Sequence, residues 1–157
     1  MENNEIDKLK ELGSFFRKMN GKMKLVSLLK KAKEEYDKNN FAESLSNCKK
    51  ALEQDPQNSV ALRGLGCIMQ ATGNNKQALK FFNKALEFSQ NKEIEYTLIG
   101  TLYYKEKMFN EAIKYYNLAI DINDSYDPAN NGLSQSILEN HLEILDVQDR
   151  LIEREIF

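Results

Sequence analysis

Residues 59–92, SVALRGLGCIMQATGNNKQALKFFNKALEFSQNK, align without a gap with residues 25–58 before them and residues 93–126 after them. Each of these three copies is 34 residues long. One alanine column recurs in the second half of every copy, at Ala51, Ala85 and Ala119. A repeat of this period is typical of a solenoid, in which each unit buries its apolar face against the next. The chain is therefore predicted to present an elongated surface rather than an enclosed cavity.

Small residues occupy two further columns of the repeat, where helix backbones are expected to approach closely. These columns hold Ala32, Gly66 and Gly100 in the first half of each copy and Ser44, Ala78 and Ala112 in the second half. Between the columns, apolar residues recur at helical spacing, and turn-forming residues separate the runs. This pattern predicts six helices at residues 25–38, 41–54, 59–72, 75–88, 93–106 and 109–122.

The period, the small-residue columns and the ending Ala-Leu-Glu-Gln-Asp-Pro at residues 51–56 resemble those of the tetratricopeptide repeat family. The resemblance covers residues 25–126 and implies an all-α fold, a right-handed superhelical α-solenoid of antiparallel helix pairs. It also implies a concave groove lined by the first helix of each pair. The closing proline of the family occurs only at Pro56, and the usual early Trp is absent.

Extra helices are predicted at both ends, which divides the chain into an N-terminal helix and linker (1–24), three repeats (25–58, 59–92, 93–126) and a C-terminal capping helix with an extension (127–157). An apolar stripe in residues 4–19 is expected to end at a break, Asn20-Gly21. Residues 127–142 can cap the third repeat, whereas the apolar residues beyond them would be exposed unless they fold back, dimerise or dock a partner. The residues predicted to mediate self-association, through which a homodimer could form, are Phe16, Leu145, Ile152 and Ile156.

The charge of the chain is small overall but unevenly distributed. The formal net charge is −2. Residues 1–58 carry 12 basic and 10 acidic side chains, and residues 127–157 carry 2 and 7. Because no global basic field results, nucleic acid is not an expected partner. The acidic C-terminal region could meet a basic partner or the basic front of a neighbouring molecule, although a solvated helix face is the simpler interpretation.

Several functional classes lack a signal in this sequence. No apolar run approaches the roughly 20 residues needed to span a bilayer, and the N-terminus has no signal-peptide core, so a cytoplasmic location without membrane association is expected. Cys48 and Cys67 lack metal-site spacing, His141 is the only histidine, and no glycine-rich nucleotide loop occurs. No catalytic, metal or cofactor-binding residue is therefore predicted, and an enzyme is not expected.

The resemblance implies that function resides in the groove, where another protein would be bound. The predicted peptide-binding residues are Leu29, Lys30, Lys33, Tyr36, Arg63, Cys67, Gln70, Thr97, Thr101, Tyr104 and Lys105. An apolar floor with basic groups beside it favours an extended or helical peptide that carries apolar and acidic side chains. We expect Arg63→Glu to weaken such binding and to leave folding intact.

Some members of the family hold the C-terminal carboxylate of heat-shock chaperones with a clamp of Lys, Asn and Arg side chains. The matching positions here are Leu29, Lys33, Gly64, Ile94 and Leu98, so the clamp is missing. The layout is also similar to that of the short chaperones of type III secretion translocators. A chaperone for an unfolded cargo segment is therefore one alternative to a scaffold or adaptor, and a self-assembling structural module is another.

Overall fold

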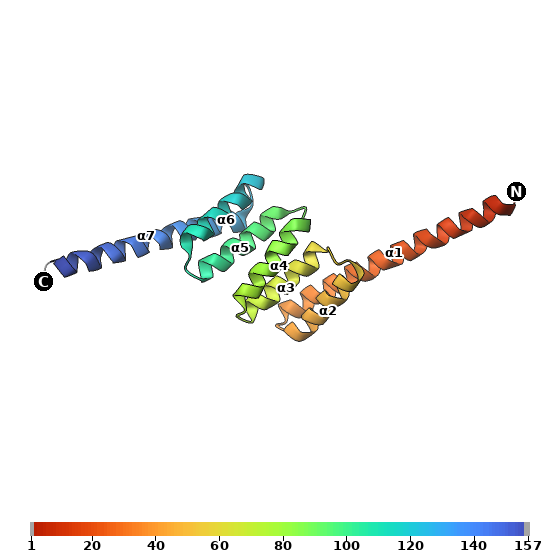
Figure 1. Ribbon diagram of the computed structural model, residues 1–157, viewed down its shortest axis with the longest axis horizontal. Helices are drawn as coiled ribbons and strands as arrows, with labels where there is room; N and C mark the ends of the chain where they lie inside the picture. Colours follow the sequence, from red (N-terminus) through yellow and green to blue (C-terminus); the bar gives the residue numbers. More distant parts are fainter. Residues whose placement is uncertain (1, 156–157) are drawn as a thin grey trace.

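The computed structural model describes the backbone of residues 2–155 and the side chains of residues 7, 8, 10–148 and 150. Within this range the fold is all α, with no strand (Figure 1). The helices are α1 (Glu2–Asp37), α2 (Phe41–Gln54), α3 (Ser59–Ala71), α4 (Asn75–Phe88), α5 (Lys92–Lys105), α6 (Phe109–Ile122) and α7 (Asp127–Glu155). The pairs α1/α2, α3/α4 and α5/α6 stack in sequence order, and α7 packs on the last pair. The predicted solenoid is thereby confirmed.

The turn inside each helix pair has the same backbone conformation at the same position of the repeat. Its left-handed residues are Asn39, Gly73 and Lys107, with φ of 61°, 81° and 60°. These positions are 34 residues apart, so the repeat extends to the turns as well as to the core. Only glycine adopts this conformation without steric cost, and the flanking helices therefore impose it on Asn39 and Lys107.

The predicted break at Asn20-Gly21 is wrong, because α1 is continuous from Glu2 to Asp37. A glycine inside a helix costs about 1 kcal/mol relative to alanine, which weakens the helix without ending it. Glycine ends a helix when it takes the left-handed conformation, as Gly73 does after α3. Gly21 does not adopt it, and a Cβ added there would meet nothing within 4 Å. The repeats and the N-terminal flank therefore share one helix.

The helix crossings are formed by the small-residue columns. Ala51, Ala85 and Ala119 are completely buried. The Phe82 ring lies directly on the backbone of Gly66, where a Cβ atom would collide with it. In the next crossing, a Cβ on Gly100 would lie 3.0 Å from Cδ1 of Tyr116. The second and third repeats thus each place an aromatic ring of their second helix against a glycine of their first, whereas the first repeat has Cys48 at the position of these rings.

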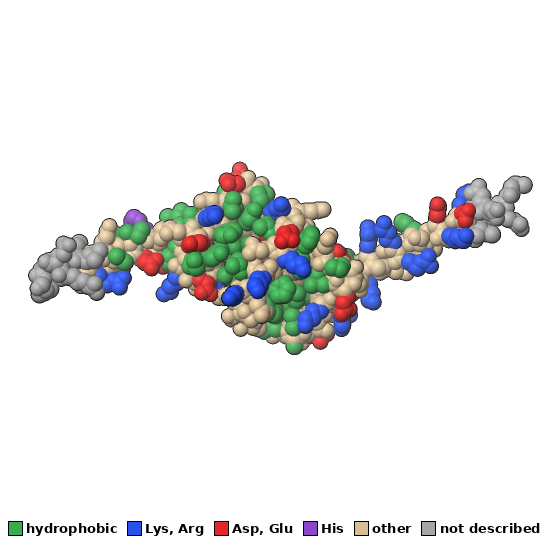
Figure 2. Space-filling view, in the orientation of Figure 1, with side chains coloured by type: hydrophobic (Ala, Val, Ile, Leu, Met, Phe, Trp, Pro, Cys, Tyr) green, Lys and Arg blue, Asp and Glu red, His purple; other side chains and the backbone are tan. Residues whose placement is uncertain are grey.

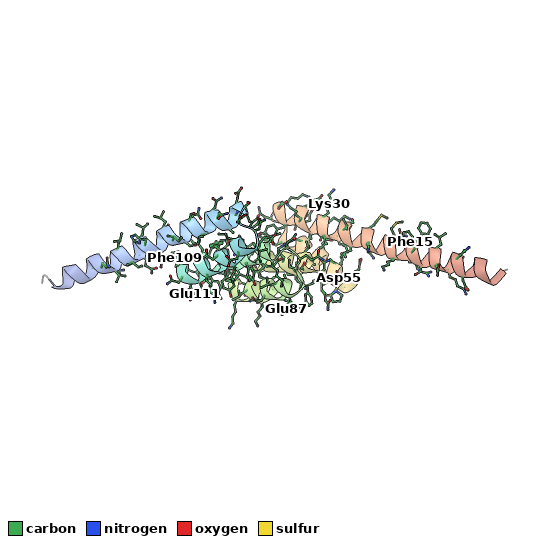
Figure 3. The ribbon with its side chains drawn as sticks, turned by 90° about the horizontal axis from the view of Figure 1, so that it is seen from above. Phe15, Lys30, Asp55, Glu87, Phe109 and Glu111 are labelled. Atoms are coloured by element: carbon green, nitrogen blue, oxygen red, sulfur yellow. The ribbon has the colours of Figure 1, made fainter. Side chains whose placement is uncertain are left out.

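The helix α7 caps the third repeat over its first turns and then leaves it. Ala129 and Ser136 are completely buried against the repeat. The amide of Asn140 donates a hydrogen bond to Oδ1 of Asn110, 3.3 Å away. Beyond Asn140 the described side chains are exposed. At the other end, residues before Leu25 extend away from α2 in the same manner (Figures 1 and 3).

Both projecting segments carry exposed apolar side chains. Phe16 is 48% exposed and Leu145 is 44% exposed, so two of the residues predicted to mediate self-association are accessible. The side chain of Ile152 and the whole of Ile156 lie outside the described residues. Among the helices that the structure describes, none is both long and apolar enough to cross a membrane.

The crossing of Gly66 and Phe82 provides a test of the packing. We expect Gly66→Ala to lower the free energy of unfolding by about 1–3 kcal/mol, because the added methyl group must displace the Phe82 ring. Gly21→Ala is the matched control, since a Cβ there meets nothing within 4 Å. It should raise helix content and not lower stability, because alanine is the better helix former. Urea unfolding followed by circular dichroism measures both. Equal effects of the two substitutions would contradict the packing described.

Candidate functional site

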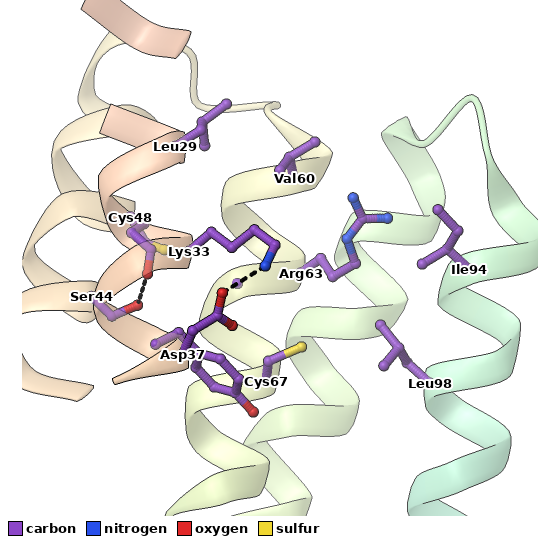
Figure 4. Close-up of a pocket in the computed structure, with 13 residues that line it drawn as sticks. Leu29, Lys33, Asp37, Ser44, Cys48, Val60, Arg63, Cys67, Ile94 and Leu98 are labelled. Carbon is purple, nitrogen blue, oxygen red and sulfur yellow. Dashed lines mark hydrogen bonds and ion pairs between the residues drawn. The ribbon is translucent and has the colours of Figure 1, made fainter. Parts of the chain in front are cut away.

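A pocket opens between the first helices of the three repeats, α1, α3 and α5 (Figure 4). Its volume is about 380 Å³, in the range of pockets that bind small ligands or side chains. The residues that line it are Leu29, Ala32, Lys33, Tyr36 and Asp37 on α1, Ser44 and Cys48 on α2, Val60, Arg63, Gly64 and Cys67 on α3, and Ile94 and Leu98 on α5. We refer to this site as the α1/α3/α5 pocket.

The depth of the pocket depends on a glycine. A Cβ on Gly64 would lie 2.8 Å from the sulfur of Cys48, so the missing side chain leaves room for that buried sulfur at the pocket floor. Beside it, the Ser44 hydroxyl donates a hydrogen bond to the carbonyl of Ala32 at 2.7 Å. This bond uses the hydroxyl hydrogen of Ser44, so Ser44 offers no free donor on the floor. The floor can therefore receive an apolar side chain.

Two basic side chains, Lys33 and Arg63, line the pocket, and each forms an ion pair with an acidic side chain of the same protein. Lys33 Nζ lies 2.7 Å from Oδ2 of Asp37, and both side chains are exposed (Figure 4). This hydrogen bond raises the pKa of Lys33. An exposed pair of this kind contributes little to stability and can be exchanged for another partner. Lys33 is therefore available to a bound acidic group.

The second cation, Arg63, forms a different kind of pair. Its Nη1 donates to Oε1 of Glu95 on α5 at 3.1 Å. The Glu95 side chain is completely buried and that of Arg63 is 21% exposed. The other carboxylate oxygen, Oε2, has no hydrogen-bond partner among the described residues. Removing one member of a buried ion pair leaves an uncompensated charge, so Arg63 also stabilises the contact between α3 and α5.

The two cysteines differ in access. Cys48 is 2% exposed, and burial raises the pKa of its thiol to about 11. Cys67 is partly exposed at the pocket wall. Burial raises its pKa too, against the lowering effect of Arg63. At neutral pH both groups are therefore protonated thiols with little nucleophilic character.

Five of the predicted groove residues line the pocket: Leu29, Lys33, Tyr36, Arg63 and Cys67. The other six, Lys30, Gln70, Thr97, Thr101, Tyr104 and Lys105, lie outside it. Lys30 is exposed and lies 3.7 Å from Glu34, and Lys105 is exposed at the end of α5. The amide nitrogen of Gln70 is buried and has no hydrogen-bond partner within the described part of the chain.

The other three predicted groove residues outside the pocket, Thr97, Thr101 and Tyr104, pack within the third repeat. Thr97 is buried, and its hydroxyl donates to the carbonyl of Glu93 at 2.7 Å. The Thr101 hydroxyl donates to the carbonyl of Thr97 and accepts a bond from the Tyr116 hydroxyl at 3.1 Å. The ring of Tyr104 packs on that of Phe109, with 5.7 Å between centroids. The buried Thr97 is not accessible to a peptide, which corrects its assignment to the groove surface.

Three lining residues come from a helix crossing and not from the predicted groove face. Ala32, Ser44 and Cys48 belong to the crossing of α1 and α2, and the sulfur of Cys48 has room at the pocket because Gly64 has no side chain. The sequence contained one indication of this opening, which is Gly64 itself. It lies two positions before Gly66, a residue of a small-residue column. No group of three or more potential metal ligands lies together among the described side chains.

The ion pair of Arg63 and Glu95 gives a prediction that replaces the sequence-based one. Arg63→Glu should lower the free energy of unfolding by about 3–5 kcal/mol, because it leaves a buried carboxylate facing a second one. The double variant Arg63→Leu, Glu95→Leu should recover most of the loss, since no charge then remains buried. Lys33→Glu, at an exposed pair, is the matched control and should change stability little. Thermal unfolding measures all three. An Arg63→Glu protein as stable as the parent would refute this role.

Thiol reactivity tests the arrangement of the pocket. In the folded protein, iodoacetamide should modify Cys67 before Cys48, because only Cys67 is partly exposed. Modification should be slower than that of free cysteine at neutral pH and should accelerate as pH rises, because burial raises the pKa of both thiols. Peptide mass spectrometry identifies the site. In Cys67→Ser the native protein should remain unmodified, and prior labelling of Cys48 would contradict the geometry.

The sequence of this chain is similar to a known family profile and to parts of larger proteins. Residues 35–100 and residues 96–126 each match a family profile described as Tetratricopeptide repeat. The chain is 31% identical over 93 residues to Anaphase-promoting complex subunit 3 of Schizosaccharomyces pombe, which covers 59% of this chain. It is 28% identical over 92 residues, also 59% of this chain, to the probable UDP-N-acetylglucosamine--peptide N-acetylglucosaminyltransferase SPINDLY of Solanum lycopersicum. The chain spans only 13% and 10% of the lengths of these two proteins.

A solved structure has the same fold. The first TPR of Spaghetti (RPAP3) bound to the HSP90 peptide SRMEEVD superposes with a TM-score of 0.67. The match has 18% sequence identity and covers 74% of this chain and 94% of that one. At this identity the likeness establishes the helical repeat architecture.

Proposed function

Because this chain belongs to the tetratricopeptide repeat family, we propose that it is a protein-interaction scaffold whose α1/α3/α5 pocket holds an apolar side chain of a partner peptide. The family match and the helical repeats support the general role. The composition of the pocket supports the apolar anchor, since four of its members are Leu29, Val60, Ile94 and Leu98. A concave, mostly apolar site with a few polar groups suits a peptide anchor.

The main support for this proposal is that five pocket positions hold different residue types from those of the carboxylate clamp. The positions that match the carboxylate clamp of the family, Leu29, Lys33, Gly64, Ile94 and Leu98, all line this pocket. Four of them have no charge, so the place at which the clamp would hold a terminal carboxylate is instead apolar. A chain end is charged and strongly hydrated, and the four uncharged positions offer it no side-chain donor. The proposed ligand is therefore an internal segment of the partner rather than its C-terminus.

The charges beside the pocket favour a partner with an acidic residue next to the apolar one. Arg63 has five N–H donors, and its bond to Glu95 uses one of them. Lys33 can exchange its exposed bond with Asp37 for a bond to the ligand. Both groups lie at the α1/α3/α5 pocket, so an acidic neighbour of the anchor could reach either.

A binding role is also favoured over catalysis at this pocket. Nucleophilic cysteines in enzymes have a lowered pKa, whereas burial raises the pKa of both Cys48 and Cys67. The ionic side chains are paired within the protein, Lys33 with Asp37 and Arg63 with Glu95. The match to SPINDLY involves one tenth of that protein and carries none of its activity to this chain.

The proposal is tested by selecting displayed peptides that bind the full chain. Selected sequences should share a large apolar residue with an acidic neighbour and should bind equally well with an amidated C-terminus. A bound peptide should slow alkylation of Cys67, which lies in the pocket wall. Leu98→Asp should weaken binding at least tenfold, about 1.4 kcal/mol. Ile122→Asp is the matched control, because Ile122 is exposed on α6 away from the pocket, and it should leave affinity unchanged.

Three outcomes would count against the proposal. Peptides that need a free C-terminal carboxylate would indicate a clamp that these residues do not form. Equal losses in Leu98→Asp and Ile122→Asp would place binding elsewhere. Protection of an extended segment of a bound unfolded protein from proteolysis, without an apolar anchor in the pocket, would favour the cargo-chaperone alternative.

A further inference from the structure

Two helical segments of this protein carry apolar side chains that the described part of the chain leaves exposed. We define the N-terminal arm as residues 10–26 of α1 and the C-terminal arm as residues 137–148 of α7. Each carries six large apolar side chains that are between 38% and 65% exposed. These are Leu12, Phe15, Phe16, Met19, Met23 and Val26 on the first arm, and Ile137, Leu138, Leu142, Ile144, Leu145 and Val147 on the second. An exposed apolar surface of this extent on two helices marks an interaction site.

The arms cannot cover one another within a single molecule. They project from opposite ends of the stacked repeats, as two perpendicular views show (Figures 1 and 3). Phe15 stands on the N-terminal arm well away from the repeats (Figure 3). The partner of each arm must therefore come from a second molecule.

The apolar spacing on both arms is that of a coiled-coil seam. On the N-terminal arm, Leu12, Phe16, Met19, Met23 and Val26 follow one another at intervals of four and three residues. On the C-terminal arm, Leu138, Leu142 and Leu145 do the same. Alternating intervals of four and three keep a seam on one side of each helix, so that two such helices can interdigitate along their length.

The charges on the two arms are opposite in sign. The N-terminal arm has five basic side chains and one acidic one, and Lys and Arg side chains are prominent on it in Figure 2. The C-terminal arm has three acidic side chains, Glu139, Glu143 and Asp146, and no Lys or Arg. A pair of like arms would bring like charges together, whereas a pair of unlike arms would neutralise them.

From these observations we propose that the N-terminal arm of one copy packs along the C-terminal arm of a second copy, in a head-to-tail contact. Such a contact is heterologous, because it uses two different surfaces. Each copy in such a pair uses one arm and keeps the other free, so the contact can be repeated with further copies. It leaves the α1/α3/α5 pocket unoccupied, because neither arm supplies most of its lining.

The direction of the helices supports a parallel pairing. The chain runs toward the repeats along α1 and away from them along α7, so both arms point the same way along the molecule (Figure 1). In a parallel pair the two sets of repeats lie at opposite ends of the overlap and do not meet. An antiparallel pair would bring them to the same end. Because the C-terminal seam, from Leu138 to Leu145, spans only about one heptad, the contact is weak and assembly grows as protein concentration rises.

The test uses full-length chains in which one seam at a time is made polar without a change of charge. The first variant carries Phe16→Gln and Met19→Gln, and the second carries Leu142→Gln and Leu145→Gln. Light scattering should show a mass for the parent chain that rises with concentration beyond that of a monomer. Each variant alone should stay monomeric. An equimolar mixture should reach twice the monomer mass and no more, because each variant retains one intact arm.

Other results overturn the proposal. A parent chain that stays monomeric at all concentrations excludes self-assembly through the arms. Association of the second variant alone indicates a contact between two N-terminal arms, and association of the first alone indicates one between two C-terminal arms. Failure of the mixture to associate excludes the head-to-tail contact. Circular dichroism confirms folding, and Ile122→Gln, at an exposed residue outside both arms, should behave as the parent chain does.

Discussion

The close approach of helix backbones at the small-residue columns is the constraint on which the rest of the structure depends. Where the ring of Phe82 lies on the backbone of Gly66, the glycine has no room for another carbon atom. The same contact recurs between Tyr116 and Gly100 in the next pair. Because packed interiors have almost no spare volume, these contacts set the distance between the two helices of a pair. That distance fixes where the first helices, and hence the pocket between them, can lie.

The pocket and the core are built from the same residues. Gly64 opens the pocket floor to the sulfur of Cys48, a core residue. Arg63 lines the pocket and also compensates the buried carboxylate of Glu95 on the neighbouring repeat. A substitution intended to alter binding at these positions therefore alters stability as well. Leu98 on α5 is subject to the same limit, because it lines the pocket and also packs against the core cluster of Ala78, Phe82, Ile99 and Leu102.

The two arms follow a different principle from the repeats. Inside the stack each helix has neighbours on several sides, so its apolar face is buried by the chain itself. In the arms, α1 and α7 continue past the last neighbour, and their apolar stripes remain exposed. A soluble monomer rarely keeps a large exposed apolar surface without an interaction that covers it. Opposite charges on the two arms make a second copy a suitable partner, while the pocket remains free for another protein.

The sequence by itself determined the number of repeats, the small-residue crossings, and, within one residue, the helix limits of the repeats other than the start of α1. These features are local and periodic, so one copy of the repeat predicts the others. Only the tertiary structure decided which groove residues form the pocket. The rotation of each helix about its axis places Thr97 in the core and Leu98 in the pocket lining, although the two are adjacent in the sequence. The pairing of Arg63 with Glu95, across 32 positions, depends on how α3 meets α5. The sequence also did not predict that α1 continues through Gly21. A glycine ends a helix only where the surrounding packing requires a turn.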